Sequence, residues 1–182
     1  MRKIVLLLAA LGMTAALGAC GSSSSKSTSS TTVHVAVPVG TNPSKSAKMV
    51  CQPEAQSDVA GSLGVKTTQV TPPTWADHVY SCKYVYPNGS FTLSVKELAN
   101  KPQTDAYFAQ LQHTLGQSTA TAPDLGQGAF TTPNGSLVVR KDFKVLTVDV
   151  SGLPAQFGAP PQARSSVALS IGTVVMGCWT GA

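Results

Sequence analysis

The side chains that could hold a metal ion or act as a catalytic base are few and widely spaced. The histidines are His34, His78 and His113, and no two of them have the i, i+4 spacing that places two ligands on one helical face. Asp77 precedes His78, but neighbouring residues of a strand point to opposite faces, so this carboxylate is poorly placed to orient the imidazole. The chain has neither a Cys-x-x-Cys pair nor a Gly-x-Ser-x-Gly motif. We therefore expect no metal site, no cofactor and no enzymatic activity.

The cysteines are the other reactive side chains, and they number four: Cys20, Cys51, Cys82 and Cys178. Cys20 belongs to the N-terminal signal described below, which indicates an oxidising compartment for the rest of the chain. There the other cysteines predict one disulfide and one leftover thiol. A Cys51–Cys82 bond, which would join the first helix of the domain to a strand, is preferred to a Cys82–Cys178 bond. Cys178 would then be a buried thiol on the last helix.

Aromatic residues supply one candidate binding side chain. Trp75 follows two prolines in an expected loop, where its ring could stack on a sugar or on a partner. The alternative is that it folds back to cover the edge of the sheet. Three tyrosines of the following strand share one face, and we expect them to belong to the core rather than to a binding platform: Tyr80, Tyr84 and Tyr86.

The N-terminal residues carry the most specific pattern of the chain. Arg2 and Lys3 precede an almost entirely apolar run over residues 4–18, and small residues then lead into Cys20. A cationic start, a short apolar run and a cleavage site of small residues are the layout of a secretory signal peptide. The run is about fifteen residues long, shorter than the roughly 20 that a membrane-spanning helix needs.

The sequence Leu17-Gly18-Ala19-Cys20 resembles the lipobox of bacterial lipoproteins. This resemblance implies that residues 1–19 are removed and that Cys20 is diacylated and becomes the first residue of the mature protein. It also implies that lipid holds the protein at the extracytoplasmic face of the cell membrane. The alternative is an ordinary cleaved signal peptide followed by an unmodified cysteine.

A tether is expected after the lipidated cysteine. Residues 21–32 are almost all Ser and Thr, a composition that cannot build a packed core. We place the tether over residues 20–46 and a single folded domain over residues 47–182. Within the tether, Val33–Val39 has the alternation of a strand. It could be an edge strand docked on the domain or an exposed segment that finds a partner.

Two Asn-Gly dipeptides between alternating apolar runs predict type I′ hairpins, with turns at residues 88–89 and 134–135. Closure of these turns would give the following pairs: Tyr86 with Phe91, Tyr84 with Leu93, Cys82 with Val95, Thr132 with Leu137, and Phe130 with Val139. A third strand over residues 145–150 would then pair Val139 with Leu146 and Leu137 with Val148.

Helices are expected over residues 53–63, 104–115 and 161–178, because apolar residues recur there with a helical period. The predicted fold is an α+β fold, an antiparallel sheet with helices on one face. The tetrapeptide Pro-Asn-Gly-Ser occurs twice, each time after a helix. One interpretation is a duplicated helix-plus-three-strands unit closed by a C-terminal helix; the other is chance recurrence of a common turn.

The charge pattern argues against a nucleic-acid partner. The formal net charge is +5, but Arg2 and Lys3 leave with the signal peptide, and the remaining charges are scattered, whereas nucleic acid requires a coherent basic face. The domain weakly resembles actinobacterial lipoproteins of unknown function, which share a lipobox, a Ser/Thr tether and a cysteine-stapled α+β domain. We expect a monomeric, non-enzymatic envelope protein that binds a partner protein or envelope component. One alternative is a carrier of an apolar ligand such as a lipid, enclosed between sheet and helices. The other is a hydrolase, which no residue pattern supports.

Overall fold

A computed structural model of the protein describes residues 39–118 and 124–179, so Cys20, the expected tether as far as residue 38 and the segment Val33–Val39 apart from its last residue lie outside the described residues. The helices are α1 (Lys45–Met49), α2 (Pro53–Leu63), α3 (Lys101–Leu115) and α4 (Arg164–Cys178). The strands are β1 (Gln69–Val70), β2 (Thr74–Ala76), β3 (Val79–Tyr86), β4 (Gly89–Glu97), β5 (Ala129–Thr131), β6 (Leu137–Lys141), β7 (Lys144–Asp149), β8 (Gln156–Phe157) and β9 (Gln162–Ala163).

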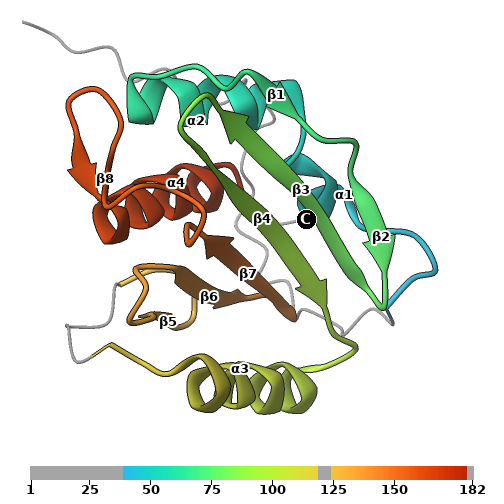
Figure 1. Cartoon of the computed structure of the whole chain (residues 1–182). Helices are drawn as coiled ribbons and strands as arrows, with labels where there is room; N and C mark the ends of the chain where they lie inside the picture. Colours follow the sequence, from blue (N-terminus) through green and yellow to red (C-terminus); the bar gives the residue numbers. More distant parts are fainter. Residues whose placement is uncertain (1–38, 119–123, 180–182) are drawn as a thin grey trace, which may run out of the picture. The chain divides into compact units, whose positions relative to one another are not determined.

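Seven of the strands form one antiparallel sheet in the order β1-β3-β4-β7-β6-β5, and β2 also pairs with β3 (Figure 1). The remaining strands, β8 and β9, form a small separate ribbon. This arrangement confirms the predicted α+β class with an antiparallel sheet.

The three predicted helices are present. Two of them begin at a different residue from the predicted one, because of a helix cap or a neighbouring ribbon. Helix α2 ends as expected at Gly64, which has a left-handed φ of 65°. Helix α3 begins earlier than predicted because Asn100 caps it: the Asn100 side chain accepts a hydrogen bond from the N–H of Gln103 at 3.0 Å. Helix α4 begins later than predicted because the preceding residues form the β8–β9 ribbon. The short α1 helix was not predicted.

One face of the sheet carries the main core, covered by α1, α2 and α4. Apolar side chains from these helices interlock with the inward side chains of β3, β4, β6 and β7. Trp179, at the end of α4, is 2 % exposed and closes this core. The largest fully buried members of this layer are Tyr84, Phe91, Leu63, Leu93, Leu137, Leu146 and Ile171.

Helix α3 packs on the opposite face, so the helices are not confined to one face as the sequence had suggested. Phe108 of α3 meets a second, smaller cluster formed by Phe130, Val138 and Val145. Its ring stands edge-on to that of Phe130, with 5.2 Å between the ring centroids. The sheet is therefore covered on both sides over β5, β6 and β7.

The second hairpin differs from its predicted register by one residue, which explains the place of α3. Phe130 lies opposite Val138 rather than Val139, and a one-residue shift reverses the face of every side chain. The turn is wider than a two-residue loop: the N–H of Thr132 donates to the carbonyl of Ser136 at 2.9 Å. Phe130 thus points to α3 instead of the main core.

The first hairpin is shifted by two residues, which leaves the same side chains in the core. Tyr84 pairs with Phe91 and Cys82 with Leu93, and the loop is Pro87–Asn88. Gly89 is therefore a strand residue. A Cβ there would lie 2.7 Å from the carbonyl oxygen of Gly152, so glycine is required by a close approach of two backbones rather than by the predicted turn.

Two consecutive left-handed residues occur instead at two turns that lack glycine. Asp77 and His78 join β2 to β3 with φ values of 49° and 57°, and Asp142 and Phe143 join β6 to β7 with φ values of 48° and 59°. Positive φ at both central residues is the type I′ pattern. The β6–β7 pairing has the predicted register: residue 139 lies opposite 146, and 137 opposite 148.

The two Pro-Asn-Gly-Ser copies lie at non-equivalent places, which favours chance recurrence over duplication. The first copy joins β3 to β4, the last two of the four strands in the first half of the sheet. The second copy joins β5 to β6, the first and second strands of the other half. The preceding helices, α2 and α3, also pack on opposite faces.

Candidate functional site

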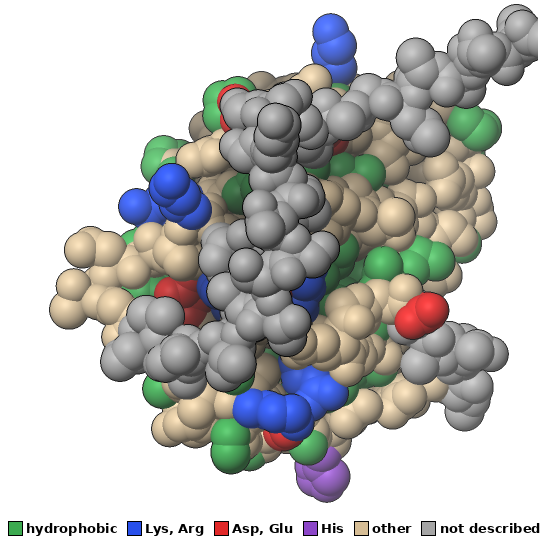
Figure 2. Space-filling model, turned by 180° about the vertical axis from the view of Figure 1, so that it is seen from behind, with side chains coloured by type: hydrophobic (Ala, Val, Ile, Leu, Met, Phe, Trp, Pro, Cys, Tyr) green, Lys and Arg blue, Asp and Glu red, His purple; other side chains and the backbone are tan. Residues whose placement is uncertain are grey.

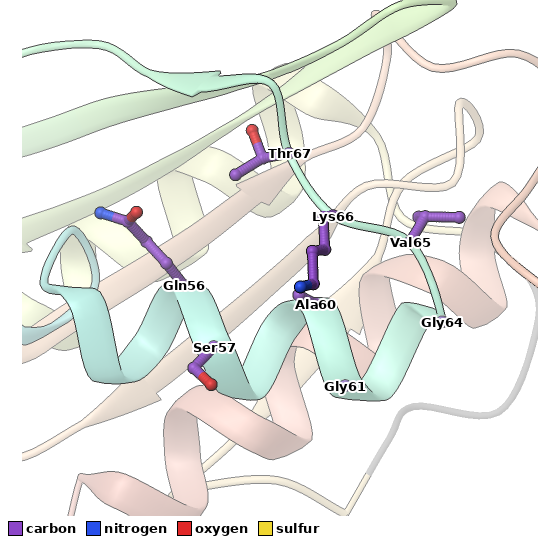
Figure 3. A pocket seen from close by; sticks show the side chains of 8 residues that line it. All are labelled: Gln56, Ser57, Ala60, Gly61, Gly64, Val65, Lys66 and Thr67. Atoms are coloured by element: carbon purple, nitrogen blue, oxygen red, sulfur yellow. The ribbon is translucent and has the colours of Figure 1, made fainter.

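An open groove of about 560 Å³ runs along α2 and the chain that follows it (Figure 3). Its lining residues are Gln56, Ser57, Ala60, Gly61, Gly64, Val65, Lys66 and Thr67. Four lining residues of α2 and its C-cap are small and are spaced three or four residues apart: Ser57, Ala60, Gly61 and Gly64. This spacing places them on one helical face. The other face of α2 carries Ala55, Val59 and Leu63 into the core. The groove is therefore on the outside of the helix.

Backbone geometry and hydrogen bonds hold the two walls of the groove. The left-handed Gly64 turns the chain back along α2, and a Cβ there would clash with the carbonyl of Ala159. The hydroxyl of Thr67 lies 2.7 Å from the carbonyl oxygen of Val85, which fixes the returning chain against β3. At the other end, the amide Nε2 of Gln56 donates to the carbonyl of Cys51 at 2.9 Å.

The chemistry of the groove is that of a binding surface. It offers an amide, two hydroxyls and one ammonium group, that of Lys66, whose side chain reaches back over Ala60 (Figure 3). The hydroxyl of Ser57 points away from this ammonium group (Figure 3). No two titratable groups converge among the lining residues, so the groove has no acid–base pair.

The disulfide joins Cys51 to Cys82, the pairing that the sequence favoured, with an S–S distance of 2.12 Å. It connects the turn before α2 to the centre of β3. Cys178, half-buried at the end of α4, has its Sγ 3.5 Å from Oδ2 of Asp58. It is not a free thiol, so the expectation of a leftover thiol is wrong. That expectation counted only three cysteines as available for disulfides, because Cys20 was expected to be lipidated. Cys20 itself lies outside the described residues.

Trp75 lies in the edge strand β2 rather than in the loop predicted for it, and it does not line the groove. It pairs with Tyr80, and its indole N–H donates to the carbonyl of Thr41 at 2.8 Å. Its ring stands edge-on to that of His78, with 5.7 Å between centroids. Trp75 is half-buried at the edge of the sheet and lies outside the main core.

The remaining candidates from the sequence are dispersed or buried. His113 is exposed on α3, far along the chain from His78, and His34 lies outside the described residues. The hydroxyl of Tyr84 donates to the carbonyl of Val50 at 2.7 Å. Burial raises the pKa of Tyr86 to about 12, so its phenol stays neutral. Tyr84 and Tyr86 are core residues, as predicted.

Over the part of the chain that the structure describes, no three His, Cys, Asp or Glu side chains are grouped closely enough to hold a metal ion. No described helix is long and apolar enough to cross a membrane. On the face seen in Figure 2, the described Lys and Arg side chains stand apart or beside acidic ones, without forming a continuous basic surface.

The groove was not predicted from the sequence, although one pattern could have drawn attention to it. Small residues at positions 57, 60, 61 and 64 form a stripe on the face of α2 opposite the apolar one. A stripe of this kind leaves room beside the helix backbone. The stripe alone does not make a groove, because the second wall is the returning chain at residues 65–67. The position of that chain depends on pairing with β3.

Comparison with known proteins adds no relative from which a site or an activity could be carried over. The chain matches no protein-family model, no curated protein and no solved structure.

Proposed function

We propose that this protein is a non-enzymatic lipoprotein of the cell envelope that binds a partner protein or envelope component through the groove along α2. The lipid is carried by Cys20, and the Ser/Thr-rich tether lets the domain reach a partner beyond the membrane surface. The lipobox-like sequence at residues 17–20 supports the anchor. The groove itself is the observation that supports binding.

The composition of the groove favours recognition over hydrolysis. A hydrolytic serine needs a base within hydrogen-bond reach and an orienting group behind that base. Ser57 and Lys66 are the lining residues that could contribute, and their polar atoms point apart (Figure 3). What remains is the Ser57 hydroxyl, the part of the Gln56 amide that does not bond to Cys51 and one positive charge along a small-residue floor, which suits an extended polar segment of a partner.

The carrier alternative receives less support, because large side chains occupy the space between the sheet and its helices. Tyr84, Leu93 and Ile171 are fully buried there with 0 % exposure. A lipid carrier would need an apolar chamber at this place. The groove is on the far side of α2 from these residues and is open to solvent.

Filling the groove should abolish partner binding. A Cβ at Gly61 would meet no atom within 4 Å, and the same holds for Gly177 on α4, which provides a matched control. With a photo-crosslinker at position 57 in cells of the native host, Gly61→Trp should lower the yield of the crosslinked species on the order of tenfold or more. Gly177→Trp should leave the yield unchanged, and both variants should keep the thermal midpoint of the parent.

The same experiment can refute the proposal. Crosslinking that persists in Gly61→Trp would place the partner elsewhere on the surface. A complete absence of a crosslinked species from position 57 in the parent protein would remove the groove as a binding site.

A further inference from the structure

The tetrapeptide Pro-Asn-Gly-Ser occurs at residues 87–90 and again at residues 133–136, and Asn-Gly has a characteristic reaction. The backbone nitrogen of the glycine attacks Cγ of the asparagine side chain, and ammonia leaves. Water then opens the resulting cyclic imide, giving aspartate or isoaspartate. Water is the only co-reactant. Since the local sequence is identical at both sites, any difference in rate must come from the fold.

Asn134 is held in a geometry that opposes this attack. Its Oδ1 accepts hydrogen bonds from the hydroxyl of Thr132 at 2.5 Å and from the N–H of Ser136 at 3.0 Å. Asn134 is itself exposed, but its two hydrogen-bond donors belong to Thr132 and Ser136, which are each 4 % exposed. The N–H of Gly135, the attacking nitrogen, donates to the carbonyl of Thr132 at 2.9 Å. The amide would have to leave both of its donors before Cγ could swing over the glycine nitrogen.

Asn88 lacks the side-chain hydrogen bonds that hold Asn134, although the following residue, Gly89, is paired with Tyr86 in the β3–β4 ladder. It is exposed at the tip of the β3–β4 hairpin. None of the described residues forms a hydrogen bond with its side chain. Its amide can therefore rotate over the following nitrogen without breaking a hydrogen bond to the protein.

We propose that Asn88 is a site of spontaneous deamidation in the folded protein and that Asn134 is protected from it. The product places a negative charge at the tip of the hairpin. The isoaspartate form also adds a backbone methylene next to Gly89, where the chain has little room. The N–H of Ser90 donates to the carbonyl of Gly152 at 3.0 Å, and this contact is the one that the longer backbone would loosen. The fraction of molecules that have reacted at Asn88 therefore increases with the age of the protein.

The test compares the two sites within one protein. The mature protein is incubated at mildly alkaline pH, either folded or unfolded in denaturant with the disulfide reduced. Peptide mass spectrometry then measures conversion at each asparagine. Two lost hydrogen bonds of ordinary net strength correspond to a rate ratio on the order of tenfold or more. We expect this excess of Asn88 over Asn134 in the folded protein and equal rates in the unfolded chain.

A variant tests the stated cause of protection. Thr132→Val removes one donor to Asn134, so conversion at position 134 should rise in the folded protein while conversion at position 88 stays the same. The proposal is overturned if the two sites convert equally in the folded protein, or if Asn134 converts faster. It is also overturned if the fold protects both sites while the unfolded chain deamidates at both.

Discussion

Replacing Cys51 and Cys82 together by alanine should lower the free energy of unfolding by about 3–4 kcal/mol. The disulfide closes a loop of sequence separation 31, and its loss gives the unfolded chain back the conformational freedom of that loop. Cys82 is 3 % exposed within the main core, so alanine there also forfeits packing of the sulfur. Urea denaturation followed by circular dichroism would measure the change in midpoint.

Reduction of the parent protein provides the control for this prediction. The reduced parent and the reduced double alanine variant should unfold at similar urea concentrations, both well below the oxidised parent. A variant as stable as the oxidised parent would mean that the bond does not constrain the domain, and that packing alone attaches α2 to the sheet.

Phe130→Ala should cost about 3–5 kcal/mol of stability, the usual range for a buried phenylalanine. Phe130 has 0 % exposure and lies against Phe108 of α3 on the second face of the sheet. Leu115→Ala, at the end of the same helix, removes a side chain that is 45 % exposed, and it should change stability by no more than about 0.5 kcal/mol.

A double-mutant cycle between Phe108 and Phe130 distinguishes the observed register from the one that the sequence predicted. In contact, the two rings should show a coupling energy of about 0.5–1.5 kcal/mol. If Phe130 instead faced the main core, as pairing with Val139 would require, the two substitutions would be additive. Additivity would therefore contradict the placement of α3.

The elements that the sequence predicted well are those whose signals are local. Alternation over residues 79–98 and 137–150 marks strands, because each has one face in the core. The short β6–β7 turn leaves little freedom for slippage, and its register was predicted correctly. The Cys51–Cys82 pairing was favoured because it joins the first helix to an inward-facing strand position.

The elements that it missed depend on tertiary contacts. Asn-Gly suggested tight turns, yet Gly89 is needed for its close approach to Gly152, and Gly135 belongs to a wider loop closed by Thr132. Neither requirement is visible in the dipeptide itself. The one-residue shift at β5 turns Phe130 away from the main core, and this explains why α3 packs on the opposite face of the sheet. The groove depends on where the chain after Gly64 meets β3, which no local pattern of α2 reveals.

The anchor at Cys20 is the claim on which the proposed role depends most. Its most direct test is mass spectrometry of the N-terminal peptide of the protein extracted from native membranes, together with detergent-phase partitioning of the parent and Cys20→Ser. We expect a chain that begins at Cys20, carries acyl groups on that residue and partitions into detergent, whereas Cys20→Ser carries none and leaves the detergent phase. A Cys20 sulfur that is unmodified or joined to another cysteine, or partitioning that survives the substitution, would contradict the account.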